Sequence, residues 1–152
     1  MVQRKNMGII VAAITGMVFG GVTTIEGYVG RTVGAVNASL IEHSLAALVA
    51  VPAVVFLYLR GTLTWEGTKS ILPISAVAGV LIIVAVAGVA YAMPIVGVAA
   101  GNMAMLFGQM AVAVAIDMIG VGGYDKVPLT WPRVLGLALM IVGVYLVLPR
   151  QS

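Results

Sequence analysis

The sequence contains no cysteine and a single histidine, His43, among its 152 residues. Without cysteine the chain can form neither a disulfide framework nor a thiolate nucleophile, and one histidine cannot build a zinc site alone. A Ser-His-Asp constellation is not visible either. The sequence therefore predicts that the protein is not an enzyme and holds no cofactor or metal.

Charge is also scarce, because 9% of the residues are charged whereas 62% are hydrophobic. A soluble domain of this length could not bury so much apolar surface. The net charge of +3 comes from eight Lys and Arg residues scattered between apolar runs, which form no basic face. This distribution argues against a nucleic-acid partner and indicates that the main partner is the lipid bilayer.

Long apolar runs fill nearly the whole chain, and about 20 such residues are needed to cross a bilayer as a helix. The runs are continuous and lack the polar-apolar alternation of barrel strands, so we expect helices. The five predicted spans cover about residues 7–25, 36–59, 71–92, 94–119 and 132–148. The predicted fold is an all-α polytopic membrane protein, with residues 1–152 forming a single transmembrane domain.

The connections between these spans are short, so none could hold a soluble domain. They comprise residues 26–34, 60–70, a tight corner at 91–94, and 120–131. Gly16, Gly20 and Thr24 recur every four residues on one face of the first span. Small residues at this spacing let membrane helices approach closely, so we expect them, like Gly136 and Gly143, to form packing seams.

The distribution of Lys and Arg predicts the orientation, because these residues favour cytoplasmic loops. With the amino terminus inside, six cations are cytoplasmic and two are outside. The six are Arg4, Lys5, Arg60, Lys69, Lys126 and Arg133, and the two are Arg31 and Arg150. The sequence therefore favours a cytoplasmic amino terminus and an external carboxyl terminus.

Three polar residues, Asn102, Gln109 and Asp117, interrupt the fourth apolar span. Such groups are costly in lipid and normally face a protein interior or a watery cavity. Asn102 and Gln109 are seven residues apart and share a helix face, which either lines a substrate path or makes interhelical hydrogen bonds. Asp117 lies near the cytoplasmic end, where we expect a structural role, in water or paired with Lys126 or Arg133.

The second span opens with a polar run in which Ser39, Glu42 and His43 fall on one helix face. A carboxylate beside an imidazole just below the membrane surface can pass protons, hold a cation or bind a substrate. The equally weighted alternative is a helix start that dips into the lipid headgroups, where Glu42 favours the positive end of the helix.

Glu26 closes the first predicted span and should lie level with Glu42 near the outer surface. Arg31, five residues later, is its expected partner in a structural ion pair at the interface. The functional alternative is a proton or cation site shared by Glu26, Glu42 and His43, with Asn102 entering from the fourth span.

The carboxyl-terminal half resembles the YdcZ-like five-helix branch of the drug/metabolite transporter superfamily. The resemblance rests on Gly108-Gln109, Ile116-Asp117, Gly120, Gly123, Leu129, Trp131, Arg133, Leu135-Gly136 and Ile141 to Val144. Upstream, Val29-Gly30-Arg31 matches a shorter motif, whereas Val22 and Glu26 stand where the family has Gln and Asn.

The resemblance implies one transporter repeat in the inner membrane that works as an antiparallel dimer, with a second copy or with an oppositely oriented paralogue. The function that we expect is secondary transport of a small organic solute or cation, with proton-coupled export as the leading form. Asn102, Gln109, Glu42 and His43 are then the expected substrate contacts, and Glu26 and Glu42 the coupling groups. The alternative is an accessory membrane subunit of a larger complex.

Overall fold

The computed structural model describes the backbone of residues 2–63, 65–66, 68–120 and 125–149, with side chains at all of these except 2–5 and 68. Three of the cations that predict the orientation lie outside the described part. They are Arg150 and the side chains of Arg4 and Lys5. Gly123, one of the residues that carry the family resemblance, also lies outside it.

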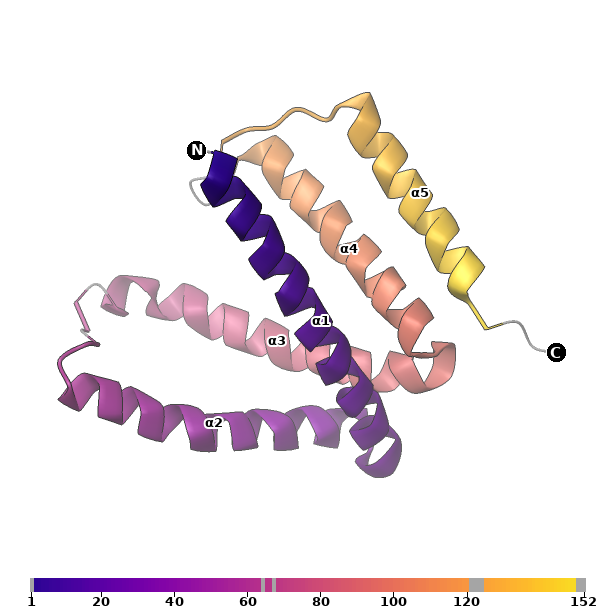
Figure 1. Ribbon diagram of the computed structural model, residues 1–152. Helices are drawn as coiled ribbons and strands as arrows, with labels where there is room; N and C mark the ends of the chain where they lie inside the picture. The colour runs from indigo at the N-terminus through magenta and orange to yellow at the C-terminus, as the bar shows by residue number, and fades with distance from the viewer. Residues whose placement is uncertain (1, 64, 67, 121–124, 150–152) are drawn as a thin grey trace. The chain divides into compact units, whose positions relative to one another are not determined.

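The described residues form five α-helices and no strand, as the sequence predicts (Figure 1). Their bounds are α1 Val2–Val33, α2 Ala35–Leu59, α3 Thr68–Val96, α4 Val98–Ile119 and α5 Trp131–Val147. The helices α1 to α4 are long and apolar enough to cross a membrane, by length and composition. The helix α5 is apolar but shorter, at 17 residues, which is at the lower limit for a span.

Two of the predicted connections are wrong. The segment 26–34 is not a loop, because α1 continues to Val33, and the corner predicted at 91–94 lies inside α3. The chain turns instead at single glycines, Gly34 between α1 and α2 and Gly97 between α3 and α4. Both have nearly the same backbone conformation, with φ of 85° and 84° and ψ near 150°, a region open essentially to glycine alone.

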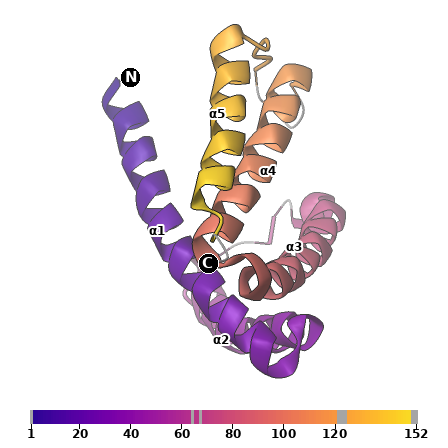
Figure 2. The same cartoon turned by 90° about the vertical axis from the view of Figure 1, so that its right-hand side faces the viewer.

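The chain divides into two compact units, residues 1–20 with 95–152, and residues 21–94. In the first unit α4 and α5 lie side by side in both views (Figures 1 and 2). The second unit contains α2, most of α3 and the carboxyl-terminal part of α1, together with the buried polar residues of the described chain, Thr23, Glu26 and Ser39. Each unit carries a different group of the predicted site residues.

Aromatic and cationic side chains gather where α2 ends. The Tyr58 and Trp65 rings are 6.2 Å apart, and the Arg60 guanidinium lies 4.9 Å from the centre of the Phe56 ring. Tyrosine, tryptophan and arginine are enriched at the membrane surface, where one end of the side chain is apolar and the other is hydrated. This end of α2 is therefore suited to a membrane surface.

Candidate functional site

The glycine turn between α1 and α2 brings two acidic residues together. Glu26 lies eight residues before Gly34, and Glu42 lies eight residues after it. Since each helical residue rises about 1.5 Å, both carboxylates are about 10 Å or more from the turn, along neighbouring helices. Glu26 therefore lies well inside α1. The sequence had predicted that it lies at the end of the first span.

Glu26, Glu42 and His43 form an acidic cluster in the second unit. Glu26 interacts electrostatically with both Glu42 and His43. Glu26 is only 4% exposed, and one carboxylate oxygen of each acid, Oε2 of Glu26 and Oε1 of Glu42, is buried without a hydrogen-bond partner in the described structure. An unsatisfied buried carboxylate is costly when it is charged.

Hydrogen bonds fix the imidazole and its surroundings. The Nδ1 of His43 lies 2.7 Å from the carbonyl oxygen of Ser39, and because a carbonyl can only accept, Nδ1 carries a proton. This leaves Nε2 as a hydrogen-bond acceptor. The Ser39 hydroxyl, which is fully buried, donates to the carbonyl oxygen of Ile83 on α3 at 2.8 Å. The cluster is thereby tied to α3.

The ion pair predicted between Glu26 and Arg31 is absent from the described residues. Because 26–33 is helical, the two residues lie about 140° apart around α1 at about 100° per residue, so their side chains diverge. Arg31 instead donates from Nη2 to the carbonyl oxygen of Pro94 at 3.2 Å. Arg31 therefore joins α1 to the end of α3 instead of pairing with an acid.

The helices α1 and α3 meet through glycine next to Glu26. A Cβ added at Gly30 would lie 2.9 Å from the Cβ of Ala90 and still closer to the Ala90 carbonyl oxygen. Pro94 has no N–H, so that carbonyl lacks its donor within the helix. The Cα–H of Gly30 therefore approaches a carbonyl freed by proline, a contact that recurs where helices cross. Gly27 also lies close to α3, where an added Cβ would be 2.9 Å from the Cβ of Met93.

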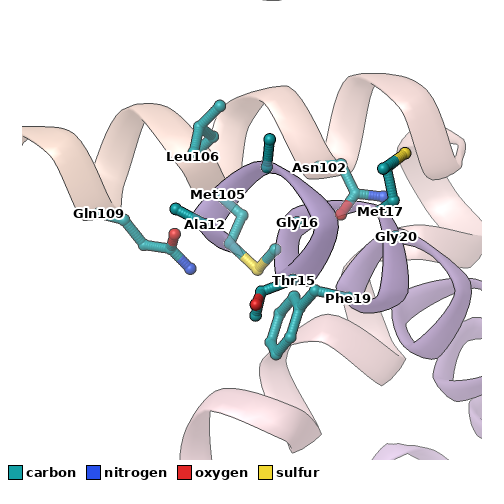
Figure 3. Close-up of a pocket in the computed structure, with 11 residues that line it drawn as sticks. Ala12, Thr15, Gly16, Met17, Phe19, Gly20, Asn102, Met105, Leu106 and Gln109 are labelled. Atoms are coloured by element: carbon teal, nitrogen blue, oxygen red, sulfur yellow. The ribbon is translucent and has the colours of Figure 1, made fainter. Parts of the chain in front are cut away.

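The first unit holds a cavity of about 750 Å³ between α1 and α4, which we call the α1–α4 cavity. Figure 3 shows Asn102, Met105 and Gln109 on α4 facing the α1 helix. The lining residues are Ala12, Ala13, Thr15, Gly16, Met17, Phe19, Gly20, Asn102, Met105, Leu106 and Gln109. The volume lies within the range of about 300 to 1,000 Å³ typical of small-molecule sites.

Polar groups enter this cavity mainly from one helix face. Asn102 and Gln109 share the lining with Met105, at spacings of three and four residues. Asn102 donates from Nδ2 to the carbonyl oxygen of Val98 at 2.9 Å. No hydrogen bond is recorded for the Gln109 amide within the described residues. The amide pair thus combines one partly fixed group with one that can turn toward a ligand.

The glycines expected to form a seam on α1 line this cavity instead. A Cβ added at Gly16 or Gly20 would meet no atom within 4 Å in the described structure. The close helix crossing of α1 occurs further along, at Gly27 and Gly30. On α5, Gly143 does pack, against the Cε of Met103, whereas Gly136 lines a smaller cavity.

Asp117 pairs with Arg133, joining the end of α4 to the start of α5. The Arg133 Nη2 donates to Oδ2 at 3.0 Å, with both side chains about one third exposed. The backbone carbonyl of Asp117 also accepts from the N–H of Val127 at 2.9 Å. The pair borders a cavity of about 240 Å³ with Met110 and Gly136. Of the two cations expected as partners for Asp117, Lys126 and Arg133, the one that binds it is Arg133.

The predicted substrate contacts fall into two groups. Asn102 and Gln109 line the α1–α4 cavity, whereas Glu42 and His43 belong to the acidic cluster of the other unit. Sequence reasoning missed Thr15 and Phe19 in the cavity and the fully buried Thr23 beside Glu26. Thr23 precedes Glu26 by one helical turn, a spacing that could have identified it. Among the described residues, no group of three or more His, Asp or Glu side chains is placed to hold a metal.

The chain matches the model of the family described as "Putative inner membrane exporter, YdcZ" over residues 7–146. The chain belongs to this family. The match extends over all five helices, so the resemblance first seen in the carboxyl-terminal half covers nearly the whole YdcZ-family chain. No curated protein and no solved structure matches it significantly.

Membership in the YdcZ family, together with four long apolar helices, identifies a multi-pass membrane protein of a transporter class. The description of the family is that of an exporter, which is not a class of enzyme. The two groups of polar residues described above therefore lie in a protein for which a solute path is expected.

Proposed function

We propose that this YdcZ-family protein is a secondary transporter that moves a small organic solute out across the inner membrane. The observation that carries the proposal is the α1–α4 cavity, which gathers Asn102 and Gln109 from an apolar span onto one wall. Amides within a membrane span are costly unless they bond to other helices or face a solute path. Because a cavity of ligand size lies next to Asn102 and Gln109, we favour the second explanation, that these amides face a solute path.

Proton coupling is assigned to the acidic cluster. Glu26 and Glu42 each present a buried oxygen without a partner, and their like charges oppose each other. A proton taken up by either acid removes one charge and the repulsion together. The free Nε2 of His43 offers a route by which this proton could enter or leave.

The functional unit is proposed to be an antiparallel dimer, with a second copy or an oppositely inserted paralogue as the other repeat. The cation bias favours insertion of this chain with its amino terminus in the cytoplasm and its carboxyl terminus outside, which makes an oppositely inserted paralogue the favoured partner. Substrate sites of such repeat transporters lie between the repeats near the middle of the membrane. The α1–α4 cavity would then contribute one wall of the shared path.

The coupling prediction is tested with Glu26→Gln and Glu42→Gln in proteoliposomes, using a solute found by a ligand-stability screen on the purified protein. The wild type should transport faster when a proton gradient is imposed. Each substitution should remove this pH dependence, because glutamine keeps the shape of the side chain but carries no proton. Glu66→Gln, in the connection between α2 and α3, is the control and should behave as the wild type.

An unchanged pH dependence in both variants would remove the acidic cluster from the mechanism. No transport of any screened solute, together with stable copurification with a larger complex, would favour the accessory-subunit function instead.

A further inference from the structure

We propose that Gly16 and Gly20 determine which ligands the α1–α4 cavity admits, by size, and that these ligands are uncharged amphipathic molecules. The proposal rests on the proposed function, for which the cavity is the substrate site. It concerns two residues with no side chain, whose contribution is the space that they leave open.

The same helix uses glycine in two different ways. At Gly27 and Gly30, an added Cβ would lie 2.9 Å from atoms of α3, so these glycines permit close packing. At Gly16 and Gly20, both on the cavity wall, an added Cβ would meet nothing within 4 Å. Close packing therefore does not require glycine at these two positions, and any larger residue would extend into the cavity.

The other lining residues define the chemistry of the ligand. The lining carries no charged side chain, and it combines the amides of Asn102 and Gln109 and the Thr15 hydroxyl with thioethers and the Phe19 ring. A charged ligand would lose its hydration without gaining a counter-charge. An apolar body with one or two hydrogen-bonding groups matches this wall, and methionine adapts to varied shapes.

A second occupant could fill the same space, because glycines four residues apart also form contact faces between membrane helices. A helix of a second copy would then cover Gly16 and Gly20. The two kinds of occupant differ in how easily small water-soluble reagents would reach Gly16 and Gly20. A ligand cavity admits them up to a limiting size, whereas a helix contact excludes them.

The absence of cysteine makes this access measurable, because a single introduced thiol is the only one in the chain. We compare Gly16→Cys and Gly20→Cys with Gly79→Cys in membrane vesicles, using N-ethylmaleimide. Gly16 and Gly79 are matched, as each is the eleventh residue of its span and an added Cβ there meets nothing within 4 Å. Thiols react as thiolates, which need water, so those from the two cavity variants should react at least about tenfold faster than the Gly79→Cys thiol.

Size selection is tested by adding Gly16→Leu or the smaller Gly16→Ala to Gly20→Cys. Reaction with the bulky, uncharged N-(1-pyrenyl)maleimide should slow progressively from glycine to alanine to leucine, while reaction with N-ethylmaleimide changes little. Gly79→Leu in the Gly20→Cys background is the control and should leave both rates unchanged. The alanine variant keeps the test valid if the leucine variant fails to fold.

Three outcomes would overturn the proposal. The thiols of Gly16→Cys and Gly20→Cys could react as slowly as that of Gly79→Cys, or they could form disulfides between two copies of the chain. Alternatively, the substitutions at Gly16 could slow the reactions of both maleimides equally. Labelling does not require transport, so the proposed transport function and the role of the two glycines can be contradicted independently. Size-selective labelling without transport would contradict the proposed function alone. Transport without size-selective labelling would contradict only the role of the glycines.

Discussion

Single polar side chains in this protein have distinct and recognisable tasks. Asp117 binds Arg133, Arg31 binds the carbonyl oxygen of Pro94, and Asn102 lines a cavity. Their residue types alone made several of them candidates, because charged and amide groups in apolar helices need a physical reason. Which partner each one selects depends on helix geometry.

The Asp117–Arg133 pair should contribute modestly to stability. With side chains 31% and 37% exposed, its coupling is expected to be no more than about 1 kcal/mol. A double-mutant cycle of Asp117→Ala, Arg133→Ala and the double variant, followed by denaturant unfolding in detergent, measures it. The double variant should lose less stability than the sum of the single ones. Additive losses would contradict a direct interaction.

At the scale of helices, glycine and proline decide where α1 and α3 meet and where the chain turns. Pro94 was expected to start a helix, but it lies in the last turn of α3. The turn falls at Gly97, whose conformation suits only glycine. Apolar composition predicted the number of helices, but it could not distinguish a proline that breaks a helix from one whose freed carbonyl meets a neighbouring glycine.

The helix crossing at Gly30 predicts an unequal response of two glycines in α1. Gly30→Ala should destabilise the protein by about 1 to 3 kcal/mol, because its Cβ would press on the Ala90 backbone. Gly21→Ala, nine residues earlier, should be neutral or slightly stabilising, since nothing lies within 4 Å of the added carbon. Thermal unfolding in detergent compares the two. Equal stability would rule out the close crossing.

At the scale of the whole chain, the sequence predicted the helical class and the family, and it named most of the polar residues of the two candidate groups. It identified Asn102 and Gln109 by their seven-residue spacing and placed Glu26 level with Glu42. It did not reveal the α1–α4 cavity, because Gly16 and Gly20 carry the same spacing whether they pack against a helix or line open space. That difference depends on tertiary structure, which composition and periodicity do not specify.

Orientation is the property of the whole chain that reporter fusions test. Six cations against two predict a single orientation, with the amino terminus in the cytoplasm and the carboxyl terminus outside. Reporters fused to each terminus, one active only inside and one only outside, should show this arrangement in most molecules. Equal populations of both orientations would show dual insertion and would point to a homodimer of oppositely inserted copies.

The central claim is that the α1–α4 cavity binds the transported solute. The most direct measurement compares Asn102→Ala with Asn37→Ala in proteoliposome transport of a solute that stabilises the purified protein. Both amides donate to a backbone carbonyl four residues earlier at 2.9 Å, but only Asn102 lines the cavity. We predict that Asn102→Ala lowers the transport rate, and the solute affinity derived from the stabilisation, by up to about tenfold, as expected for a lost polar contact to a ligand, and that Asn37→Ala leaves both unchanged. Equal effects of the two substitutions would contradict the claim.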